Sequence, residues 1–251
     1  MSQRSVEARD PARREEVALL ARRAGAVSGD GPIQAGEYRI VLFEDREELW
    51  DAANRRRGMP LSFRSLDRRT GAGNLSRKQP LGKAIGGDST TVIDATAGLG
   101  HDAALLACMG WNVTAIERDP FIATMLELSK EDAARDPDLW EILASGLSVC
   151  RGDAAEMLGE LSADTVYLDP MFTARRKSSA LPKKPAQVLQ ALASESDDAA
   201  LLHAGLKAAP RVVVKRPSDG PPILESPDLV FAGRLVRYDV YLASGSHLSR
   251  E

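Results

Sequence analysis

Residues 91–100 read TVIDATAGLG, a short apolar strand followed by a turn that contains two glycines. Gly98 and Gly100 allow the backbone to turn sharply and to approach a ligand without a clash from a Cβ atom. The next residues, 101–109, have a helical pattern, so the N-terminus of that helix would point at the same place. A strand, a glycine turn and a helix in this order are typical of a seat for an adenosine-containing cofactor.

Strands and helices alternate from this point to the end of the chain. Strands are predicted at residues 91–95, 112–117, 147–150, 165–168 and 211–215. Helices are predicted at residues 101–109, 120–135, 154–161 and 197–208, with a further candidate at 185–193. Short β-branched strands with helical crossovers predict a mostly parallel sheet that is covered on both faces. The last two strands, 228–235 and 237–242, lie too close together for a helical crossover and predict an antiparallel hairpin.

The predicted fold is therefore α/β, with a doubly wound, mostly parallel, seven-stranded sheet of the Rossmann-like kind that ends in an antiparallel hairpin. This is the class I methyltransferase architecture, whereas dinucleotide dehydrogenases generally continue with parallel strands. Before the sheet, the pattern predicts a helix at 12–24, a strand at 38–43, a helix at 44–54 and a strand at 61–66. We expect a small N-terminal α+β portion at residues 1–85 and the main domain at residues 86–251.

The composition fits a cytoplasmic protein. The chain has 251 residues, of which 43% are hydrophobic and 27% charged, and it contains no apolar run long enough to span a membrane. It does not begin with the apolar stretch of a secretory signal. Cys108 and Cys150 are expected to be buried structural thiols, which suits a reducing compartment. The three histidines are scattered along the chain, so no metal site is expected.

Two basic segments interrupt an acidic chain whose net charge is −3. Residues 55–83 hold nine Lys and Arg against one Asp, and residues 175–184 hold five with no acid. Such localised charge is typical of a footprint for a polyanion, although each segment alone is equally consistent with a solvated loop. Lys215 has the same two interpretations, at the end of the fifth strand. The candidate RNA contacts are Arg68, Arg69, Arg175, Arg176, Lys177, Lys183, Lys184 and Lys215.

Acidic residues at the strand ends are suited to hold S-adenosyl-L-methionine. Asp94 precedes the glycine turn and can hold the ammonium of the methionine part, a group that NAD lacks. Glu117 ends the second strand, where a carboxylate can accept hydrogen bonds from both ribose hydroxyls. Asp153 can accept from the adenine amine, or it can cap the helix that follows. The turn also satisfies the G-x-G-x-x-A pattern of dinucleotide enzymes, so the glycines alone do not choose between the two cofactors.

Residues 168–172, LDPMF, follow the fourth strand and resemble a grip for a planar exocyclic amine. The lone pair of such an amine is delocalised into the ring, which makes the nitrogen a poor nucleophile. The enzyme must therefore accept hydrogen bonds from its two N–H groups and direct the lone pair at the methyl group. Asp169 can accept one bond, the carbonyl of Pro170 can accept the other, and Phe172 can stack on the base. The base would have to be unpaired or flipped. The alternative is a strand-end turn with Asp169 as a cap and Phe172 in the core.

Five segments in this order resemble the bacterial small-subunit ribosomal RNA guanine-N2 methyltransferase J family. They are VIDATAGLG-x-D at 92–102, ER at 117–118, VYLDPMF at 166–172, KSSAL-x-KK at 177–184 and RVVVKRP at 211–217. The similarity is strong over residues 90–243 and weaker over 15–89. The chain departs from the family pattern at His101, where members carry Arg, and at Asp153-Ala154, where they carry small hydroxyl residues.

The resemblance implies a cytoplasmic enzyme that uses S-adenosylmethionine to methylate N2 of one guanosine in 16S rRNA, guanosine 1516. It implies that the substrate is 16S rRNA or the small ribosomal subunit. It also places cofactor contacts at His101, Asp102, Glu117, Arg118, Asp153, Ala154 and Asp169. Two other hypotheses stay open at this point: an adenine-N6 or other amine methyltransferase, and a non-catalytic RNA-binding module with a methyltransferase fold.

Overall fold

The computed structural model describes residues 3–52, 58–68, 75–170, 188–189, 191–192 and 197–243. The chain divides into two compact units, each built from several stretches of sequence. The first unit comprises Met1–Ser65, Arg118–Trp140 and Thr173–Ser194, and the second comprises Leu66–Glu117, Glu141–Phe172 and Glu195–Glu251. The domain limits expected from the sequence, 1–85 and 86–251, stay a prediction.

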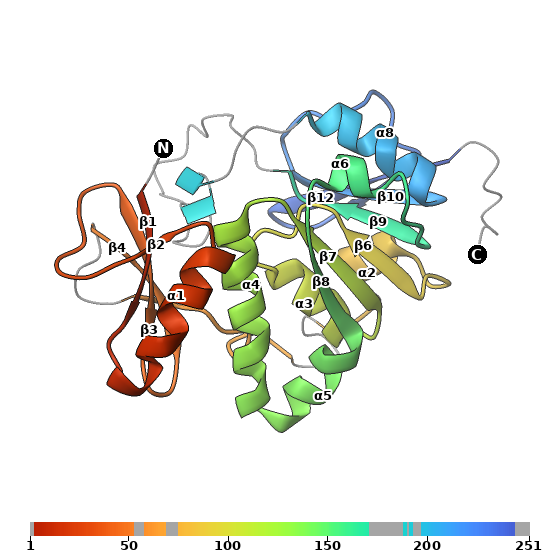
Figure 1. The fold of residues 1–251 in the computed structure, drawn as a ribbon. Coiled ribbons are helices and arrows are strands. Elements are labelled where there is room, and N and C mark those ends of the chain that lie inside the picture. Colours follow the sequence, from red (N-terminus) through yellow and green to blue (C-terminus); the bar gives the residue numbers. More distant parts are fainter. Residues whose placement is uncertain are drawn as a thin grey trace. The chain divides into compact units, whose positions relative to one another are not determined.

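The first unit contains a five-stranded sheet in the order β2-β1-β3-β4-β5 (Figure 1). Its strands are β1 (Gln3–Ala8), β2 (Val27–Ser28), β3 (Glu37–Leu42), β4 (Glu47–Asp51) and β5 (Met59–Pro60). Strand β1 is parallel to β2 and β3, whereas β3, β4 and β5 are antiparallel. The helical elements are η1 (Pro11–Arg13), α1 (Arg14–Arg23), α4 (Pro120–Asp132) and η2 (Ala133–Arg135). An ion pair between Arg23 and Glu127 joins α1 to α4.

The helix expected at residues 44–54 is wrong, because residues 47–51 form strand β4. Leu49 and Trp50 are buried by pairing with β3, where Leu49 lies opposite Ile40. Glu48 accepts a hydrogen bond of 2.9 Å from the indole N–H of Trp50. Residues 61–66 do not form the expected strand, while the expected helix at 12–24 and strand at 38–43 are confirmed as α1 and β3. Cross-strand pairing has overridden the local pattern.

The second unit contains a seven-stranded sheet in the order β11-β12-β10-β9-β6-β7-β8. Its strands are β6 (Thr91–Asp94), β7 (Asn112–Glu117), β8 (Leu147–Arg151), β9 (Thr165–Leu168), β10 (Arg211–Pro217), β11 (Leu229–Ala232) and β12 (Val236–Leu242). Strand β12 runs antiparallel to both of its neighbours, β10 and β11, whereas the strands from β10 to β8 are parallel to one another. Strands β11 and β12 form the expected hairpin. The predicted fold class is confirmed.

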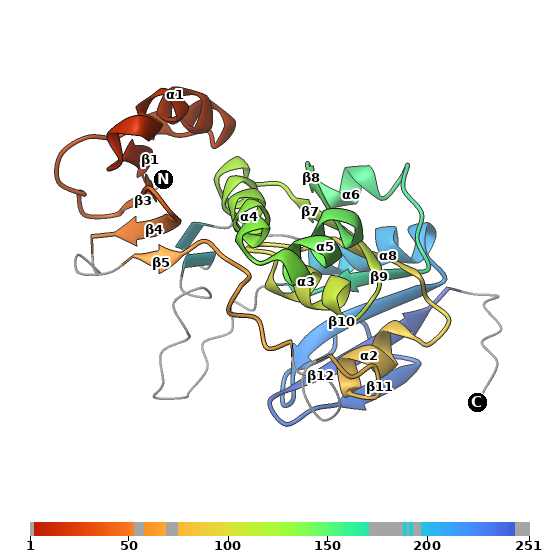
Figure 2. The ribbon, with the colours of Figure 1, turned by 90° about the horizontal axis from the view of Figure 1, so that it is seen from below.

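Helices cover both faces of this sheet. They are α2 (Pro80–Ile85), α3 (His101–Cys108), α6 (Ala154–Met157) and α8 (Asp198–Ala208), while α5 (Pro137–Gly146) leads into β8. Figures 1 and 2 show α6 and α8 on one side of the sheet and α2 and α3 on the other. Ala154 and Leu202 of α6 and α8 belong to the same buried cluster as Val166 and Val214 of the sheet. Each buried aliphatic side chain contributes about 1.5–3 kcal/mol to folding.

Helix α8 approaches the sheet closely because Gly205 faces it. A Cβ atom at this position would lie 3.1 Å from Cγ2 of Val212 and 3.2 Å from Cγ1 of Val166. These contacts are tighter than ordinary van der Waals packing, so a larger residue would push the helix away from β9 and β10. The missing side chain of Gly205 thus sets the distance at which α8 covers the core.

The strand order places a topological switch point between β6 and β9. From β6 the chain proceeds outward through β7 and β8, and it then returns to form β9 on the other side of β6. Ligands of open α/β sheets bind beyond the carboxyl ends of the strands at such a point. Asp94 is the last residue of β6 and Asp169 directly follows β9. Among the described residues, no helix is long and apolar enough to cross a membrane.

Candidate active site at the switch point

The turn after β6 has the backbone conformation that its glycines predict. Gly98 and Gly100 have φ angles of +54° and +76°, in the left-handed region that side chains with a Cβ rarely adopt. The N–H of Gly100 donates a hydrogen bond of 2.8 Å to the carbonyl of Ala97 and closes the turn. Gly100 is the N-cap residue of α3, so the helix begins directly at the turn. The partial positive charge of this helix N-terminus lies at the switch point.

Glu117 contacts the glycine turn from the end of β7. Its Oε2 accepts a hydrogen bond of 3.0 Å from the N–H of Gly98. The carbonyl of Glu117 accepts a second bond of 3.1 Å from Gly152, which follows β8. The structure therefore brings the acid at the end of the second parallel strand against the glycines behind the first strand. The contact of Glu117 with the ribose hydroxyls stays a prediction.

Asp153 caps helix α6. Its Oδ1 accepts a hydrogen bond of 2.8 Å from the N–H of Ala155. Ala154, the first residue of α6, is buried. Of the two roles expected for Asp153, the structure contains the helix cap. The contact with an adenine amine stays a prediction.

Thr96 joins the glycine turn to the segment that follows β9. Its Oγ1 accepts a hydrogen bond of 2.6 Å from the backbone N–H of Asp169, and its own N–H donates to Oδ1 of Asp94 at 3.1 Å. Asp94 is 1% exposed, whereas 41% of the Asp169 side chain is exposed. The two motifs thus meet at one edge of the sheet, with a buried acid behind and an accessible acid in front. Pro170, which comes next, is buried.

Lys215, near the end of β10, connects two of these acids. Its Nζ lies 2.6 Å from Oδ2 of Asp102 and 2.9 Å from Oδ2 of Asp169. The hydroxyl of Tyr167 in β9 donates to the same Oδ2 of Asp102 at 2.6 Å. Tyr167 was not among the residues expected at the site, and Lys215 was expected to contact RNA. The signal that could have found them is strand register, because both lie at the carboxyl ends of neighbouring parallel strands.

The charged groups of this cluster, together with burial, shift one another's pKa values. Burial, together with the charge of Asp102, raises the pKa of Asp94 well above its usual range. Although part of its side chain is exposed, desolvation by the surrounding protein raises the pKa of Asp169 to about 6, against the opposing effect of Lys215. For Asp102 burial is outweighed, and the ammonium of Lys215 lowers its pKa. Burial opposes the charge of Lys215, but the two carboxylates raise the pKa of its ammonium overall.

The other predicted site residues within the described ranges differ in exposure. Arg118 is an exposed residue of the first unit, and Arg68, in the second unit, is partly buried. His101 is exposed at the start of α3. Cys108 and Cys150 are free thiols, each only partly buried. The remaining predicted residues, Phe172, Arg69, Arg175, Arg176, Lys177, Lys183 and Lys184, lie outside the described residues.

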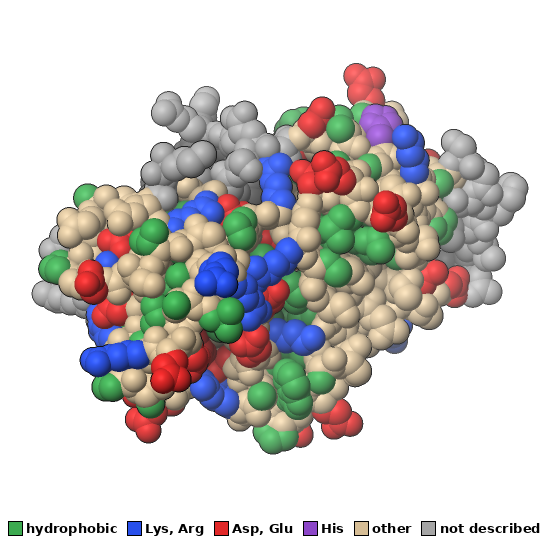
Figure 3. All heavy atoms as spheres, viewed as in Figure 1, with side chains coloured by type: hydrophobic (Ala, Val, Ile, Leu, Met, Phe, Trp, Pro, Cys, Tyr) green, Lys and Arg blue, Asp and Glu red, His purple; other side chains and the backbone are tan. Residues whose placement is uncertain are grey.

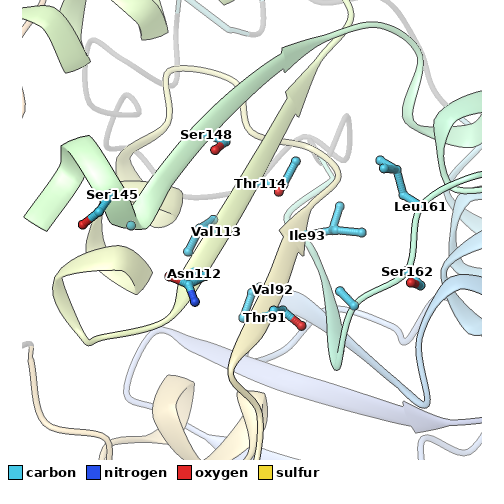
Figure 4. Close-up of a pocket in the computed structure, with 12 residues that line it drawn as sticks. Thr91, Val92, Ile93, Asn112, Val113, Thr114, Ser145, Ser148, Leu161 and Ser162 are labelled. Carbon is cyan, nitrogen blue, oxygen red and sulfur yellow. The ribbon is translucent and has the colours of Figure 1, made fainter.

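A hollow of about 160 Å³ lies at the opposite edge of the sheet (Figure 4). Thr91 and Asn112, the first residues of β6 and β7, line it together with Ser148 and Ser162. Ligands of parallel sheets bind at the carboxyl ends of the strands, and this hollow is at the amino ends. Its lining combines aliphatic side chains with hydroxyl and amide groups and contains no charged side chain. This hollow therefore does not coincide with the predicted position of the cofactor, which is at the glycine turn. No group of three or more potential metal ligands occurs in the described part of the chain.

Comparison with known proteins agrees with this geometry. The sequence model of a family described as "Putative SAM-dependent methyltransferase" matches residues 40–243. The ribosomal RNA small subunit methyltransferase J of Tolumonas auensis is 37% identical over 94% of this chain and 97% of its own length. The chain belongs to the ribosomal RNA small subunit methyltransferase J family. It is a methyltransferase, and its cofactor is S-adenosylmethionine.

Other members of the methyltransferase J family and a solved structure are also similar. The enzyme of that name from Halorhodospira halophila is 37% identical over 82% of each chain. The crystal structure of a SAM-dependent methyltransferase from Neisseria gonorrhoeae has a TM-score of 0.72 and 27% identity, and the match covers 97% of this chain and 98% of that one. The resemblance inferred from the five sequence segments is thereby confirmed.

Proposed function

We propose that this methyltransferase J family member transfers a methyl group from S-adenosylmethionine to the exocyclic N2 amine of one guanosine in 16S rRNA. The observation that carries the proposal is the hydrogen bond between the N–H of Asp169 and Oγ1 of Thr96. It brings a carboxylate that can accept an amine N–H to the glycine turn that suits the cofactor. The names of the relatives support an rRNA substrate.

The residues behind the turn fit the cofactor by their chemistry. Asp94 is a buried acid that favours a cationic partner, such as the ammonium of the methionine part. Glu117 would hold the ribose hydroxyls, and Gly98 and Gly100 would allow close approach of the ligand to the backbone. When bound, S-adenosylmethionine supplies an activated methyl group on a positively charged sulfur. His101, Asp102, Arg118, Asp153 and Ala154 remain proposed contacts of the same ligand.

The amine would be oriented by Asp169 and Pro170. The Asp169 carboxylate accepts one N–H bond and the carbonyl of Pro170 accepts the other, which leaves the nitrogen lone pair directed at the methyl group. Phe172 is proposed to stack on the guanine, a contact worth about 1–3 kcal/mol. Because the methylated nitrogen becomes acidic, a strong general base is unnecessary. The protein contributes mainly alignment.

Basic side chains are proposed to hold the RNA around the flipped guanosine. The described part of the face drawn in Figure 3 carries basic and acidic side chains intermixed and not a field of one sign. Since this face carries no continuous basic field, we propose the RNA contacts from the basic stretches of the sequence. They are Arg68 and Arg69, and the segment that contains Arg175, Arg176, Lys177, Lys183 and Lys184. The substrate in the cell would be 16S rRNA or the small ribosomal subunit, and we propose that the protein acts in the cytoplasm.

Methyl transfer to rRNA from cells that lack this protein tests the proposal. The purified protein is incubated with labelled S-adenosylmethionine and either naked 16S rRNA or small subunits, and the RNA is digested to nucleosides. We expect the label in N2-methylguanosine at one position, and on the order of 100-fold slower labelling with the Asp169→Asn variant. Label in N6-methyladenosine would overturn the choice of base. Absence of any transfer to RNA, together with no calorimetric binding of the cofactor, would favour a non-catalytic RNA-binding module.

A further inference from the structure

Lys215 is held between two carboxylates at the site where the amine is proposed to bind. Its Nζ contacts Asp102 in α3 at 2.6 Å and Asp169 after β9 at 2.9 Å. Only 24% of the Lys215 side chain is exposed, compared with 41% of the Asp169 side chain. Of the two oxygens of Asp169, Oδ2 is the one that contacts the ammonium. The lysine therefore fixes the rotation of the carboxylate.

The charge of this cluster argues against a role for Lys215 in binding phosphates. With its two carboxylates ionised, the group Asp102, Lys215 and Asp169 has a net charge of −1. A phosphate oxygen would have to displace one carboxylate while it is repelled by the other. An amine that donates a hydrogen bond to Asp169 carries no negative charge and is not repelled. The surroundings of Lys215 thus favour binding of the amine edge of a nucleobase over binding of an RNA phosphate.

We propose that Lys215 is a positioning residue of methyl transfer, which holds the Asp169 carboxylate in the orientation that accepts the amine. The inference rests on the proposed function, because it concerns how Asp169 receives its substrate. The salt bridge with Asp102 holds the ammonium of Lys215 in place, since Asp102 itself accepts a hydrogen bond from the hydroxyl of Tyr167. The same ammonium keeps Asp169 ionised, and only the ionised carboxylate can accept an N–H bond with either oxygen.

The other titratable groups around this cluster, within the described part of the chain, come from four elements. Asp94 ends β6, His101 begins α3, and Tyr167 lies in β9. Tyr238 of β12 lies opposite Lys215 in the sheet. Asp94 and Asp102 disfavour a charge on Asp169 when they are ionised, and the tyrosines are neutral at ordinary pH. Lys215 is therefore the cation in direct contact that offsets both the burial of Asp169 and the charge of Asp102.

The test compares Lys215→Met and Lys215→Arg, with Lys207→Met as the control. Lys207 is an exposed lysine at the end of α8, so its replacement removes one positive charge away from the site. The first readout needs no substrate: the pH titration of the Asp169 carboxyl carbon by NMR, assigned with Asp169→Asn. We expect its midpoint to rise by about 1–3 pH units in Lys215→Met, because an opposite charge in contact shifts a carboxyl pKa by this amount. Lys215→Arg restores the midpoint, and Lys207→Met leaves it unchanged.

The second readout separates turnover from RNA affinity. At pH 7 we expect kcat of Lys215→Met to fall on the order of 100-fold, as happens when a reacting group is misplaced. The dissociation constant for 16S rRNA should stay within about twofold of wild type, because Lys215 neutralises no phosphate in the proposed complex. An unchanged titration midpoint combined with weaker RNA binding and a smaller salt slope would overturn the inference and assign Lys215 to the phosphates.

Two further outcomes keep the test decisive. If Lys215→Met does not fold by circular dichroism, Asp102→Asn provides the opposite perturbation: removal of the like charge should lower the Asp169 midpoint, and an unchanged midpoint would contradict the proposed coupling. If the wild-type protein transfers no methyl group to any rRNA, the proposed function fails. The titration still reports on the contact between Lys215 and Asp169, so the two failures are distinguishable.

Discussion

Thr96 and Asp169 are 73 residues apart in the chain and are joined by a hydrogen bond of 2.6 Å between Oγ1 and the backbone N–H. Thr96 belongs to the turn behind the first parallel strand, and Asp169 follows the strand on the other side of the switch point. The hydrogen bond therefore places the cofactor turn directly beside the proposed amine acceptor. Without this neighbourhood, the two motifs could not serve a single transfer reaction.

Asp169→Asn should abolish most methyl transfer and leave RNA binding intact. The amide has nearly the same shape, but it loses the negative charge and turns one acceptor into a donor. We expect kcat to fall on the order of 100-fold or more. The dissociation constant for 16S rRNA should change by less than about twofold, because Asp169 contacts no phosphate in the proposed complex. Equal losses of turnover and RNA affinity would contradict this division.

Activity should decline as the pH is lowered through about 6. Burial raises the pKa of Asp169 to about 6, so its carboxylate becomes protonated below that pH and loses its capacity to accept the amine. The ionised form is the active one, and activity is therefore retained on the alkaline side. The pH profile of kcat/KM, measured with rRNA between about pH 5 and 8, checks this. Bound S-adenosylmethionine adds positive charge, so the midpoint should lie no higher than about 6.

Glu117→Gln should weaken the binding of S-adenosylmethionine. The substitution removes the negative charge of the carboxylate, which accepts a hydrogen bond from the N–H of Gly98 and is proposed to accept hydrogen bonds from the ribose hydroxyls. Hydrogen bonds to charged groups contribute about 1.5–3 kcal/mol, so the dissociation constant should rise roughly 10- to 100-fold. Isothermal titration calorimetry measures it. Glu156→Gln, at an exposed position of α6, is the matched control, and an equal effect in both variants would contradict the proposed ribose contact.

Asp164→Ala should destabilise the sheet at its amino-terminal edge. Oδ2 of Asp164 accepts hydrogen bonds from the backbone N–H groups of Thr90 and Thr91, at 2.8 and 2.9 Å, and so joins the start of β6 to the start of β9. We expect the free energy of unfolding at pH 7 to fall by about 1–3 kcal/mol, measured by urea denaturation. Glu160→Ala, an exposed acid in the same unit, should change it by less than about 0.5 kcal/mol.

The pH dependence of the same variant gives a second check. The backbone N–H groups of Thr90 and Thr91 lower the pKa of Asp164 from its usual 3.8 to about 2. A carboxyl whose pKa is depressed by folding stabilises the folded state above its unfolded pKa. This contribution disappears as the pH falls through the folded pKa. The difference between wild type and Asp164→Ala should therefore be constant above about pH 4 and shrink between about pH 4 and 2.

Charge reversal at Lys183 and Lys184 should have the opposite signature to Asp169→Asn. We expect weaker binding of 16S rRNA, and the slope of affinity against salt should fall by about 0.7–0.9 for each phosphate that is no longer neutralised. Cofactor affinity should be unchanged, and kcat at saturating RNA should be preserved. Filter binding at several salt concentrations measures the slope. An unaltered slope would show that this basic segment is a solvated loop.

Much of the sheet and part of the site could be predicted from the sequence, because both depend on local patterns. Short β-branched runs predicted the strands of the large sheet, and two glycines predicted a sharp turn, in which both have positive φ angles. The N-terminal portion was harder. Strand β1 reads QRSVEA, which has little apolar character, and β4 was mistaken for a helix because its burial comes from pairing with β3. Such pairing depends on residues that are distant in sequence.

The sequence alone therefore determined the fold class, the order of the motifs and the family, because periodicity, glycine positions and motif spacing are properties of neighbouring residues. Only the tertiary structure decided what Lys215 contacts. It became the bridge between Asp102 and Asp169. The physical reason is that the partner of a charge is set by strand register and helix position, which bring together side chains more than a hundred residues apart, such as Asp102 and Lys215.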